Sequence, residues 1–331
     1  MKALVTGGGG FLGGVIVRML RERGDQVRSF SRGEHPALGV MGVEQFQGDL
    51  SDRNAVIKAA SGCDLVFHVA ARAGIWGSHH DFYQTNVVGT ENVIAACRSN
   101  GIARLVYTSS PSVVFDGSDV DGADESLPYP DRYEAHYPAT KALAEQLVLG
   151  ANSPVLAVTA LRPHLIWGPG DNHLVPRIVA KGRAGKLRRI GTRPNLVDTV
   201  YVDNAAKAHL LAADSLYPGS PAAGNCYFIS NNEPLPLWEM VNRILATAGV
   251  PPVTRSIPPK LAYAAGCLCE GLWSLLQLSG EPPMTRFVAH ELASAHWFNI
   301  DAARRDFGYK PEISIEEGLA LLRQSFLAGQ Y

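Results

Sequence analysis

A tyrosine and a lysine stand four residues apart in the segment HYPATKALAEQ, residues 136–146. In a helix, Tyr137 and Lys141 would lie on one face, one turn apart. An ammonium group this close favours the phenolate, so we expect it to lower the pKa of the tyrosine from its ordinary value of about 10. That chemistry suits a proton donor to a carbonyl oxygen. A solvated pair without function has the same spacing, so the rest of the chain must decide.

Gly7, Gly10 and Gly13 lie between the first apolar run and the first helical pattern, in VTGGGGFLGGVIVRML. Glycines in this place permit a tight turn, let the backbone approach a pyrophosphate and allow close packing of helix on strand. Glycines also form ordinary turns, but here they stand in the order of strand, turn and helix. The segment therefore predicts a dinucleotide-binding loop.

The end of the second predicted strand indicates which dinucleotide binds. An NAD site usually carries an acidic residue there, about 20 residues after the loop, to hold the ribose hydroxyls. This chain has Ser31 and Arg32, in SFSRG, instead. A guanidinium group pairs well with a 2′-phosphate, so we expect NADPH rather than NADH. The alternative is a solvated arginine on a loop.

Short apolar runs alternate with helical patterns through the first 165 residues, which is typical of a parallel sheet with crossover helices. The predicted strands are residues 2–6, 26–30, 43–47, 64–70, 104–109 and 156–162. The predicted helices are residues 11–23, 52–61, 81–99 and 137–150. Proline and glycine become denser after residue 165, so we expect returns to the sheet mixed with the loops and helices of a smaller part.

The totals exclude several classes of function. With 30 basic and 31 acidic residues among 331, no overall field attracts nucleic acid or an anionic membrane. The five cysteines have no metal-like spacing, so we expect buried or free thiols in a reducing compartment. The chain opens on MKALVTGG, which is already strand-like and leaves no room for a leader. We therefore expect a cytoplasmic protein.

The longest apolar passage covers residues 261–280 and carries Glu270 in its middle. That charge, together with Gln277 and three glycines, argues against a spanning helix. We expect a helix packed on the substrate side or on a partner. An interfacial helix that touches lipid is the alternative.

Further motifs follow in order: GDL at 48–50, FHVAA at 67–71, NVVGTENV at 86–93, YTSSPSVV at 107–114 and then YPATK. With TGGGGFLG, they resemble the extended short-chain dehydrogenases/reductases over essentially the whole chain. Downstream, LRPHLIWGPGD and NLVDTVYVDNAAKAHLLA look like the 3β-hydroxysteroid dehydrogenase branch. GEPPMTRF and the ending ARRDFGYKPEISIEEGL are most similar to the bacterial 2-alkyl-3-oxoalkanoate reductases of long-chain olefin biosynthesis, with the sterol-4-carboxylate 3-dehydrogenases as main competitors.

The resemblance implies the catalytic residues. Tyr137 is the general acid/base, and Lys141 lowers its pKa while bonding the nicotinamide ribose. The family's serine falls in YTSS, where the register favours Ser110, with Ser109 and Ser112 left open. The residues that the resemblance and the loop motif assign to dinucleotide binding are Gly7, Gly10, Phe11, Leu12, Gly13, Ser31, Arg32, Asp49, Leu50, Ala70, Ala71, Tyr137, Lys141 and Pro163.

Two further positions bear on the resemblance. Asn86 matches the family's structural asparagine. Pro138 departs from the pattern, but proline is accepted in the first turn of a helix, so it need not disturb the alignment of Tyr137 with Lys141.

The resemblance also implies the architecture and the reaction. We expect an α/β fold, a Rossmann doubly wound parallel sheet with a smaller C-terminal α/β substrate-binding part. The NADP-binding domain would comprise residues 1–165, with 197–229 returning to the sheet, and the substrate-binding part residues 166–196 and 230–331. Tyr137 would protonate the ketone oxygen of a 2-alkyl-3-oxoalkanoic acid while NADPH delivers hydride to the same carbon. The product is the 2-alkyl-3-hydroxyalkanoic acid, and no metal is needed.

Three alternatives stay open. The same site would serve oxidation of a 3β-hydroxysteroid or a sterol-4-carboxylate. A nucleotide-sugar reaction is possible on the same fold, although nothing in the chain marks a nucleotide-diphosphate site. A regulator that senses NADP(H) without chemistry is the alternative from another class, but such proteins usually lack the tyrosine or the lysine.

An acidic, alkylated substrate needs a cation beside an apolar cleft. The candidates for the cation are Arg72, Arg177 and Arg193, and each has a surface position as its alternative. Residues 261–280 would line an alkyl channel with Trp76, Trp167 and Trp297, although tryptophans are more often core residues. Three histidines have no metal spacing and are expected in a pocket or on the surface: His79, His80 and His164.

The resemblance finally implies partners. We expect a homodimer joined through the helices at 81–99 and 137–150. We also expect assembly with the next enzymes of the olefin route, a β-lactone synthetase and a β-lactone decarboxylase.

Overall fold

The computed structural model describes residues 1–329 and is built around one seven-stranded sheet. Its strand order is β12-β7-β5-β4-β1-β2-β3, and every neighbouring pair is parallel. The chain winds outward from β1 first in one direction and then in the other, which confirms the doubly wound α/β fold. The strands are β1 Lys2–Thr6, β2 Gln26–Ser31, β3 Glu44–Gln47, β4 Leu65–His68, β5 Arg104–Thr108, β7 Ala157–Pro163 and β12 Cys226–Ile229.

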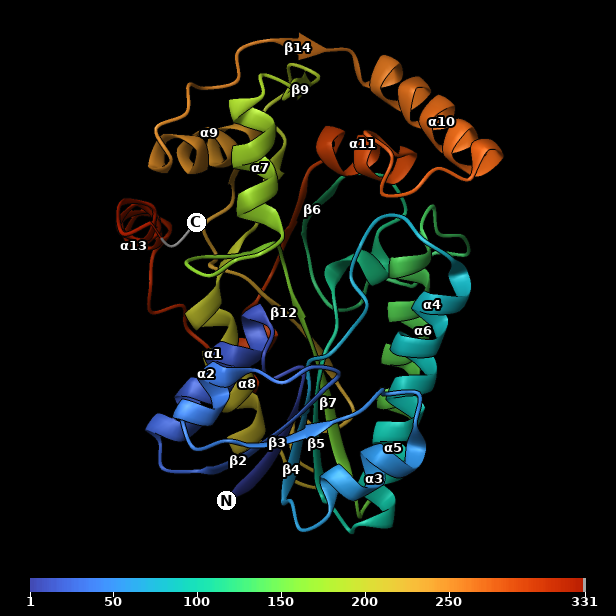
Figure 1. Ribbon diagram of the computed structural model, residues 1–331, viewed down its shortest axis with the longest axis vertical. Helices are drawn as coiled ribbons and strands as arrows, with labels where there is room; N and C mark the ends of the chain where they lie inside the picture. The colour runs from blue at the N-terminus through green and yellow to red at the C-terminus, as the bar shows by residue number, and fades with distance from the viewer. Residues whose placement is uncertain (330–331) are drawn as a thin grey trace.

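Helices cover both faces of this sheet (Figure 1). On one face, α1 (Phe11–Glu22) packs against α8 (Val202–Asp214), and on the other face lie α3 (Arg53–Ala60), α5 (Gly89–Ser99) and α6 (His136–Gly150). Ala3 and Val5 of β1 belong to the core on the α1 side, whereas Leu4 belongs to the core under α3 and α5. Because alternate side chains of a strand point to opposite faces, strands buried on both faces are continuous apolar runs.

The predicted elements of the first half are confirmed with small differences in their ends. The largest difference among the strands is β4, at Leu65–His68 instead of 64–70. The expected helix at 81–99 is wrong in one detail. It consists of α4 (His79–Tyr83), a π-helical turn η1 (Gln84–Val88) and α5. Apolar periodicity does not reveal such a widened turn, which is frequent at functional sites.

A smaller part lies beyond the carboxyl ends of the long strands (Figure 1). It contains a four-stranded sheet of order β13-β10-β15-β6 and two two-stranded sheets, β11-β8 and β14-β9. Its strands are β6 Val120–Ala123, β8 Ile166–Trp167, β9 Arg189–Ile190, β10 Leu196–Val197, β11 Val200–Tyr201, β13 Leu235–Pro236, β14 Ser256–Ile257 and β15 His296–Phe298. The remaining helices are α2 Pro36–Val40, η2 Pro111–Val114, α7 Leu174–Arg183, α9 Leu237–Thr247, α10 Pro259–Leu276, α11 Arg286–Ala293, α12 Asp301–Phe307 and α13 Ile315–Leu327.

The two parts exchange segments. β6 comes from the first half of the chain and pairs with β15, whereas α12 comes from the end of the chain and packs against β12. The expected boundary at residue 165 therefore does not separate the parts completely. The predicted range 230–331 also includes residues 330–331, which lie outside the described residues.

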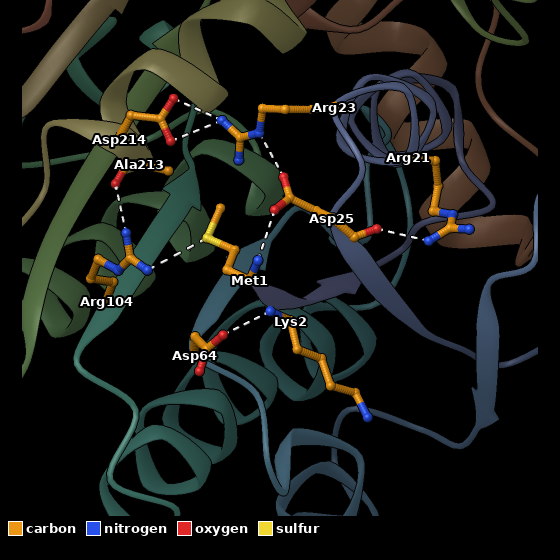
Figure 2. A network of polar contacts seen from close by, with 9 residues as sticks. All are labelled: Met1, Lys2, Arg21, Arg23, Asp25, Asp64, Arg104, Ala213 and Asp214. Carbon is orange, nitrogen blue, oxygen red and sulfur yellow. Dashed lines mark hydrogen bonds and ion pairs between the residues drawn. The ribbon is translucent and has the colours of Figure 1, made fainter.

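Charged contacts join the elements at the amino ends of the strands (Figure 2). The ammonium group of Met1 lies 3.0 Å from Asp25, which also accepts from Arg23 Nε at 2.6 Å. Arg23 pairs in addition with Asp214, at the end of α8, at 2.7 Å. Arg104, at the start of β5, donates to a carbonyl oxygen in the last turn of α8. These contacts tie β1, α1, β5 and α8 together at the end of the sheet opposite the glycine loop.

The apolar passage at 261–280 forms α10 and the turn after it. Only Ala262 and Gly266 of α10 are buried, at its contact with α11. Through residue 329, the structure has no helix with the length and apolarity needed to cross a membrane. The exposed leucines of this passage are Leu261, Leu268, Leu272, Leu275, Leu276 and Leu278.

Candidate active site

The glycine loop closes tightly between β1 and α1. Gly7 has φ +69°, a left-handed conformation that glycine adopts without strain. A side chain at Gly7 would meet the Ala70 backbone at 3.0 Å, and one at Gly13 would come within 2.1 Å of the Gly7 carbonyl oxygen. Gly10 caps α1 without a side chain, so the first N–H groups of this helix stay available for a phosphate.

This loop borders a cavity of about 650 Å³ at the carboxyl ends of the strands. Every residue that the sequence assigned to dinucleotide binding lines it, from Gly7 to Pro163. Arg72, a candidate cation for the substrate, lines it as well. Sequence reasoning assigned no site role to the other lining residues, several of which lie at or just after the ends of strands: Phe30, Gly33, His35, Gly48, Val69, Ala73, Thr85, Thr108, Leu165, Ile166, Asp171, Asn172 and His173.

One end of the cavity carries Arg32. Its side chain is exposed and forms no ion pair within residues 1–329. Asp49, which also lines the cavity, accepts from the N–H and the hydroxyl of Ser51 at 2.9 and 2.8 Å. These hydrogen bonds, and the charge of Arg32, lower the pKa of Asp49. His35 lies against the glycine loop, because a side chain at Gly9 would meet its ring.

Tyr137 and Lys141 lie at the other end, in the first turns of α6. Lys141 is 2% exposed. Its Nζ donates to the carbonyl oxygen of Thr108, at the end of β5, at 2.6 Å, and lies 4.1 Å from the centre of the Tyr107 ring. The Tyr137 hydroxyl forms a hydrogen bond with Ser110. The helix and the end of β5 thus bring the lysine, the tyrosine and a serine to one place.

The expected lowering of the Tyr137 pKa is wrong. The pKa of Tyr137 is raised, because burial disfavours the phenolate, the hydrogen bond with Ser110 offsets this only in part, and the carboxylate of Glu291 adds repulsion. Burial also lowers the pKa of Lys141 to about 7, against the attraction of Glu145. The shift of the Tyr137 pKa thus follows from burial, Ser110 and Glu291, and a largely desolvated lysine holds its charge only weakly.

The contacts single out Ser110 among the three serines. Ser110 lines the cavity, contacts Tyr137 and caps the short helix η2, with its Oγ 2.8 Å from Ser112 Oγ. Ser112 is buried behind it and does not line the cavity. Ser109 lines the cavity but is 4% exposed, and its hydroxyl has no hydrogen-bond partner among residues 1–329.

A chain of buried hydrogen bonds connects β1 with α6. The Thr90 hydroxyl donates to the Asn86 carbonyl oxygen at 2.6 Å, so its oxygen accepts from His68 Nε2 at 3.0 Å. That leaves His68 Nδ1 to accept from Thr6 at 2.8 Å. The Asn86 amide donates to Thr140 Oγ1 at 3.1 Å, and Thr140 bonds the carbonyl oxygens of the first turn of α6. Asn86 is therefore the centre of a network of which the sequence indicated only this one residue.

The same network holds the segment after β4. Asn86 accepts from the Arg72 N–H at 2.7 Å and donates to the Arg72 carbonyl oxygen at 3.2 Å. The η1 turn thus fixes both the wall of the cavity and the helix that carries Tyr137.

A buried ion pair lies behind Lys141 and was not predicted. Glu145, one turn further along α6, accepts from Arg162 Nη2 at 2.5 Å and from the Tyr129 hydroxyl at 2.6 Å. Both charged side chains are almost wholly buried. Arg162 directly precedes Pro163, so the pair links α6 to the strand end that lines the cavity.

Of the three candidate arginines, Arg72 alone lines this cavity. It pairs with Asp81 at 3.3 Å, and its guanidinium lies 5.4 Å from the centre of the Phe82 ring. Arg177 is an exposed partner of Glu281. Arg193 pairs with Asp119 at 2.6 Å and lines a different cavity.

A second cavity, of about 660 Å³, is lined by residues that directly precede Tyr137 in the chain. Tyr133 to His136, which run into Tyr137, line it together with Trp76 and the inner side of α10. Its apolar lining consists mainly of Ile75, Trp76, Phe82, Tyr133, Ala135, Cys267 and Phe287.

The expected tryptophan channel is wrong for two of its three members. Trp167 is wholly buried in the core and donates to Thr199 at 3.1 Å. Trp297 covers Gly122 and donates to Asp121, away from the cavity. Of the three tryptophans, Trp76 alone lines the second cavity. Trp167 and Trp297 lie on β8 and β15 of the smaller part, which place them elsewhere.

The three candidate histidines also lie in different surroundings. His79 and His80 are exposed on α4, as a surface position predicts. His164, just after β7, is buried, and its Nε2 lies 2.7 Å from His296 Nδ1. Because His296 Nε2 donates to the Glu291 carbonyl oxygen at 3.0 Å, His164 donates within the pair. His164 therefore belongs to the core between the two parts rather than to a pocket or the surface.

Comparison with known proteins identifies the family. A family model described as 3-beta hydroxysteroid dehydrogenase/isomerase matches residues 4–258. The chain belongs to the 3-beta hydroxysteroid dehydrogenase/isomerase family. It is 56% identical over 331 residues to the 2-alkyl-3-oxoalkanoate reductase of Stenotrophomonas maltophilia (strain K279a), covering 99% of this chain and 100% of the relative. A protein of the same name from Shewanella oneidensis is 50% identical over 98% of this chain and 86% of the relative.

More distant members of the 3-beta hydroxysteroid dehydrogenase/isomerase family carry other names. The sterol-4-alpha-carboxylate 3-dehydrogenase, decarboxylating, of Mus musculus is 35% identical over 98% of this chain and 91% of its own. Among solved structures, the UDP-glucose 4-epimerase of Thermus thermophilus in complex with NAD has a TM-score of 0.72 and 25% identity, with 99% of each chain covered. The chain is thus an oxidoreductase of this family, on a fold shared with nucleotide-sugar enzymes.

Proposed function

We propose that this protein catalyses the NADPH-dependent, reversible reduction of a 2-alkyl-3-oxoalkanoic acid to the 2-alkyl-3-hydroxyalkanoic acid in long-chain olefin biosynthesis. The observation that carries the proposal is the meeting of Tyr137, Ser110 and Lys141 where the dinucleotide cavity adjoins a second cavity whose lining is partly apolar. Relatives that match nearly the whole chain and are named for this reaction support the choice of substrate.

The side chains divide the proton chemistry among them. When bound, the nicotinamide dinucleotide supplies the hydride that reaches C3 of the substrate. Tyr137 gives its proton to the C3 oxygen, and its raised pKa keeps the phenol protonated for this step. Ser110, which already contacts the Tyr137 hydroxyl, donates to the same oxygen. Lys141 bonds the nicotinamide ribose.

The residues at the other end of the cavity support NADP(H) over NAD(H). Ser31 and Arg32 take the place of the acidic residue that holds the ribose hydroxyls in NAD sites. Arg32 has no ion-pair partner within residues 1–329 and projects from the rim of the cavity. Its guanidinium is therefore free to pair with a 2′-phosphate.

The two cavities suit an acid with alkyl chains. The apolar lining of the second cavity would hold an alkyl chain, and Arg72 between the cavities would pair with the carboxylate after leaving Asp81. The pair of Arg72 with Asp81 is largely exposed, so breaking it costs little.

Oxidation of a sterol or steroid 3β-hydroxyl is the second candidate, and the 35% identical sterol-4-alpha-carboxylate 3-dehydrogenase favours it. The same catalytic residues would serve both reactions. A sensing regulator is disfavoured because Tyr137, Lys141 and a contacting serine are all present and assembled.

Partners and location belong to the same proposal. The face of α6 that carries Leu143 and Leu147 is exposed, at 44% and 36%, and supports a homodimer through this helix and the α4–α5 segment. We propose that the dimer assembles with a β-lactone synthetase and a β-lactone decarboxylase in the cytoplasm. The free thiols of all five cysteines agree with a reducing compartment, and the exposed leucines of α10 are suited to contact with a membrane surface.

The test is oxidation of NADPH by the purified protein with a 2-alkyl-3-oxo fatty acid, beside a 3-oxosteroid. We expect turnover with the fatty acid, and loss of at least about a hundredfold of it in Tyr137→Phe, which keeps the ring but removes the proton donor. Turnover with the steroid alone would move the assignment to the sterol branch. Turnover that persists in Tyr137→Phe would remove the tyrosine from the chemistry.

A further inference from the structure

The end of the molecule farthest from the amino terminus carries a concentration of positive charge (Figure 1). The segments 172–197 and 240–269 contain no aspartate or glutamate, although the whole chain has a formal net charge of −1. The two segments lie together, because β14 pairs with β9 and α9 packs against α7. Their lysines and arginines are Arg177, Lys181, Arg183, Lys186, Arg188, Arg189, Arg193, Arg243, Arg255 and Lys260.

Most of these charges are not neutralised by the protein itself. Three of them pair with acidic residues that lie outside the two segments: Arg177, Arg193 and Arg243. The others form no ion pair within residues 1–329, and we call them the basic cluster: Lys181, Arg183, Lys186, Arg188, Arg189, Arg255 and Lys260. Arg183, Arg188 and Arg255 line one hollow of about 570 Å³, and no acidic side chain of the described residues lines it with them. The basic cluster therefore attracts anions from outside the protein.

An apolar helix begins at the edge of the basic cluster. α10 starts at Pro259, shortly after β14, and a side chain at Gly191, next to β9, would meet Pro259 Cγ at 3.4 Å. Leu261, Leu268 and Leu275 follow one another at intervals of seven residues, so they lie on one face of α10. They are 57%, 65% and 79% exposed. A row of leucines this exposed marks an interaction surface.

The other side of α10 attaches the helix to the protein. Ala262 and Gly266 are buried where α10 packs against α11, and a side chain at Gly266 would meet the Arg286 backbone nitrogen at 2.7 Å. Glu270 accepts from the Arg286 N–H at 2.7 Å and from Arg286 Nε at 2.6 Å. The one carboxylate of α10 is thus neutralised on the attached side, and the leucines face away from α11.

We propose that this surface docks on a lipid bilayer that contains anionic lipid. The leucines of α10 enter the boundary of the acyl chains, and the basic cluster pairs with the headgroup phosphates. A bilayer offers both contacts side by side, whereas an acidic protein surface offers the charge without a continuous apolar layer.

The role of this docking rests on the proposed function. Cys267, Glu270, Gly271 and Ser274 of α10 line the second cavity, which is assigned to an alkyl chain of the substrate. One helix therefore separates that cavity from the docked lipid, in which a long-chain acid dissolves. Docking thus shortens the route of such a substrate from the bilayer to Tyr137.

The experiment is sedimentation of the whole protein with lipid vesicles. One set of vesicles contains phosphatidylcholine alone, and the other contains equal amounts of phosphatidylcholine and phosphatidylglycerol. We expect binding to the mixed vesicles to be at least about tenfold tighter, because each lysine or arginine near an anionic surface adds attraction. This difference should shrink as the salt concentration rises, since salt screens the charges.

Two double variants separate the two kinds of contact. Leu268→Glu with Leu275→Glu should weaken binding to the mixed vesicles at least about tenfold, because the charges oppose entry into the acyl-chain boundary. Lys186→Gln with Lys260→Gln should weaken binding to the mixed vesicles about tenfold and leave binding to the neutral vesicles unchanged. Both lysines are exposed and have no ion pair within residues 1–329.

Matched controls carry the same changes on other surfaces and should bind as the wild type does. Leu321→Glu with Leu327→Glu alters exposed leucines of α13, which lies away from α10 (Figure 1). Lys58→Gln with Lys310→Gln removes exposed lysines outside the basic cluster. Circular dichroism of each variant establishes that the variants are folded.

Three results would overturn the proposal. They are no binding to either kind of vesicle, equal binding to both kinds, and equal losses in the variants and their controls. Sedimentation velocity without lipid tests a contact between copies of the chain: a change of oligomeric state in Leu268→Glu with Leu275→Glu would assign the leucines to that contact instead. The vesicle assay needs neither NADPH nor substrate, so its failure leaves the proposed reaction standing.

Discussion

Arg32 is exposed at the end of β2, has no ion-pair partner within residues 1–329 and lines the dinucleotide cavity. If it pairs with the 2′-phosphate, Arg32→Ala should weaken NADPH binding about tenfold or more, because a charge-assisted pair is lost. NADH has no 2′-phosphate and should bind almost as before. Dissociation constants of both dinucleotides, measured for the variant and the wild type, check this. Equal losses for the two would mean that Arg32 does not recognise the phosphate.

The raised pKa of Tyr137 predicts different pH profiles for the two directions. In the proposed mechanism, reduction needs the phenol, which a raised pKa preserves. Ionisation of Tyr137 should therefore leave kcat/KM for reduction unchanged until the pH passes about 10. Oxidation needs the phenolate instead, so kcat/KM for oxidation should rise with pH below the raised pKa of Tyr137.

A substitution of Glu291 tests the cause of this pH profile. Burial raises its pKa to about 7, although part of its side chain reaches solvent, so it ionises as the pH rises through neutrality and then raises the pKa of Tyr137. Glu291→Gln removes that charge and should move the rising limb of oxidation to lower pH. Profiles that coincide in the variant and the wild type would show that the two groups do not interact.

At the scale of the elements, the side chain of Thr140 connects the η1 turn to α6. Its hydroxyl accepts from the Asn86 amide and donates to the first turn of α6, which carries Tyr137. Thr140→Val keeps the shape but leaves the amide without this partner, so we expect kcat to fall about tenfold and the free energy of unfolding by about 1–3 kcal/mol.

Thr140→Ser is the matched variant, because it restores the hydroxyl without the methyl group. It should recover most of kcat even if packing costs some stability. Unchanged kcat and KM in Thr140→Val would mean that the network stabilises the fold but does not position Tyr137 for the reaction. Urea unfolding and steady-state kinetics on the same preparations separate the two effects.

Elements were predictable where local pattern determines them. Strands such as β1 and β5 are buried on both faces and read as short apolar runs, and the glycine loop is set by its own backbone requirements. The η1 turn, the partners of His68 and the exchange of β6 with the smaller part depend on contacts between distant segments. The pKa of Tyr137 was predicted with the wrong sign, because spacing reveals the neighbour but not the depth of burial.

At the scale of the whole molecule, the exposed leucines of α6 predict a dimer. Leu143→Glu together with Leu147→Glu would place charges in an apolar interface and should convert the dimer into monomers. Sedimentation velocity of the double variant measures this. Val155→Glu is the control, because Val155 is 76% exposed after the end of α6 and should leave the dimer intact. A wild-type monomer, or a double variant that stays dimeric, would contradict the expected interface.

The charged contacts at the amino ends of the strands (Figure 2) have a mechanical consequence. Met1, Asp25, Arg23 and Asp214 join segments that lie far apart in the sequence and need no ligand to do so. The carboxyl ends of the same strands border cavities and tight glycine turns. These contacts therefore hold the register of the strands at the end of the sheet that the cavities do not use. Residues at the opposite end can serve the site without also carrying this attachment.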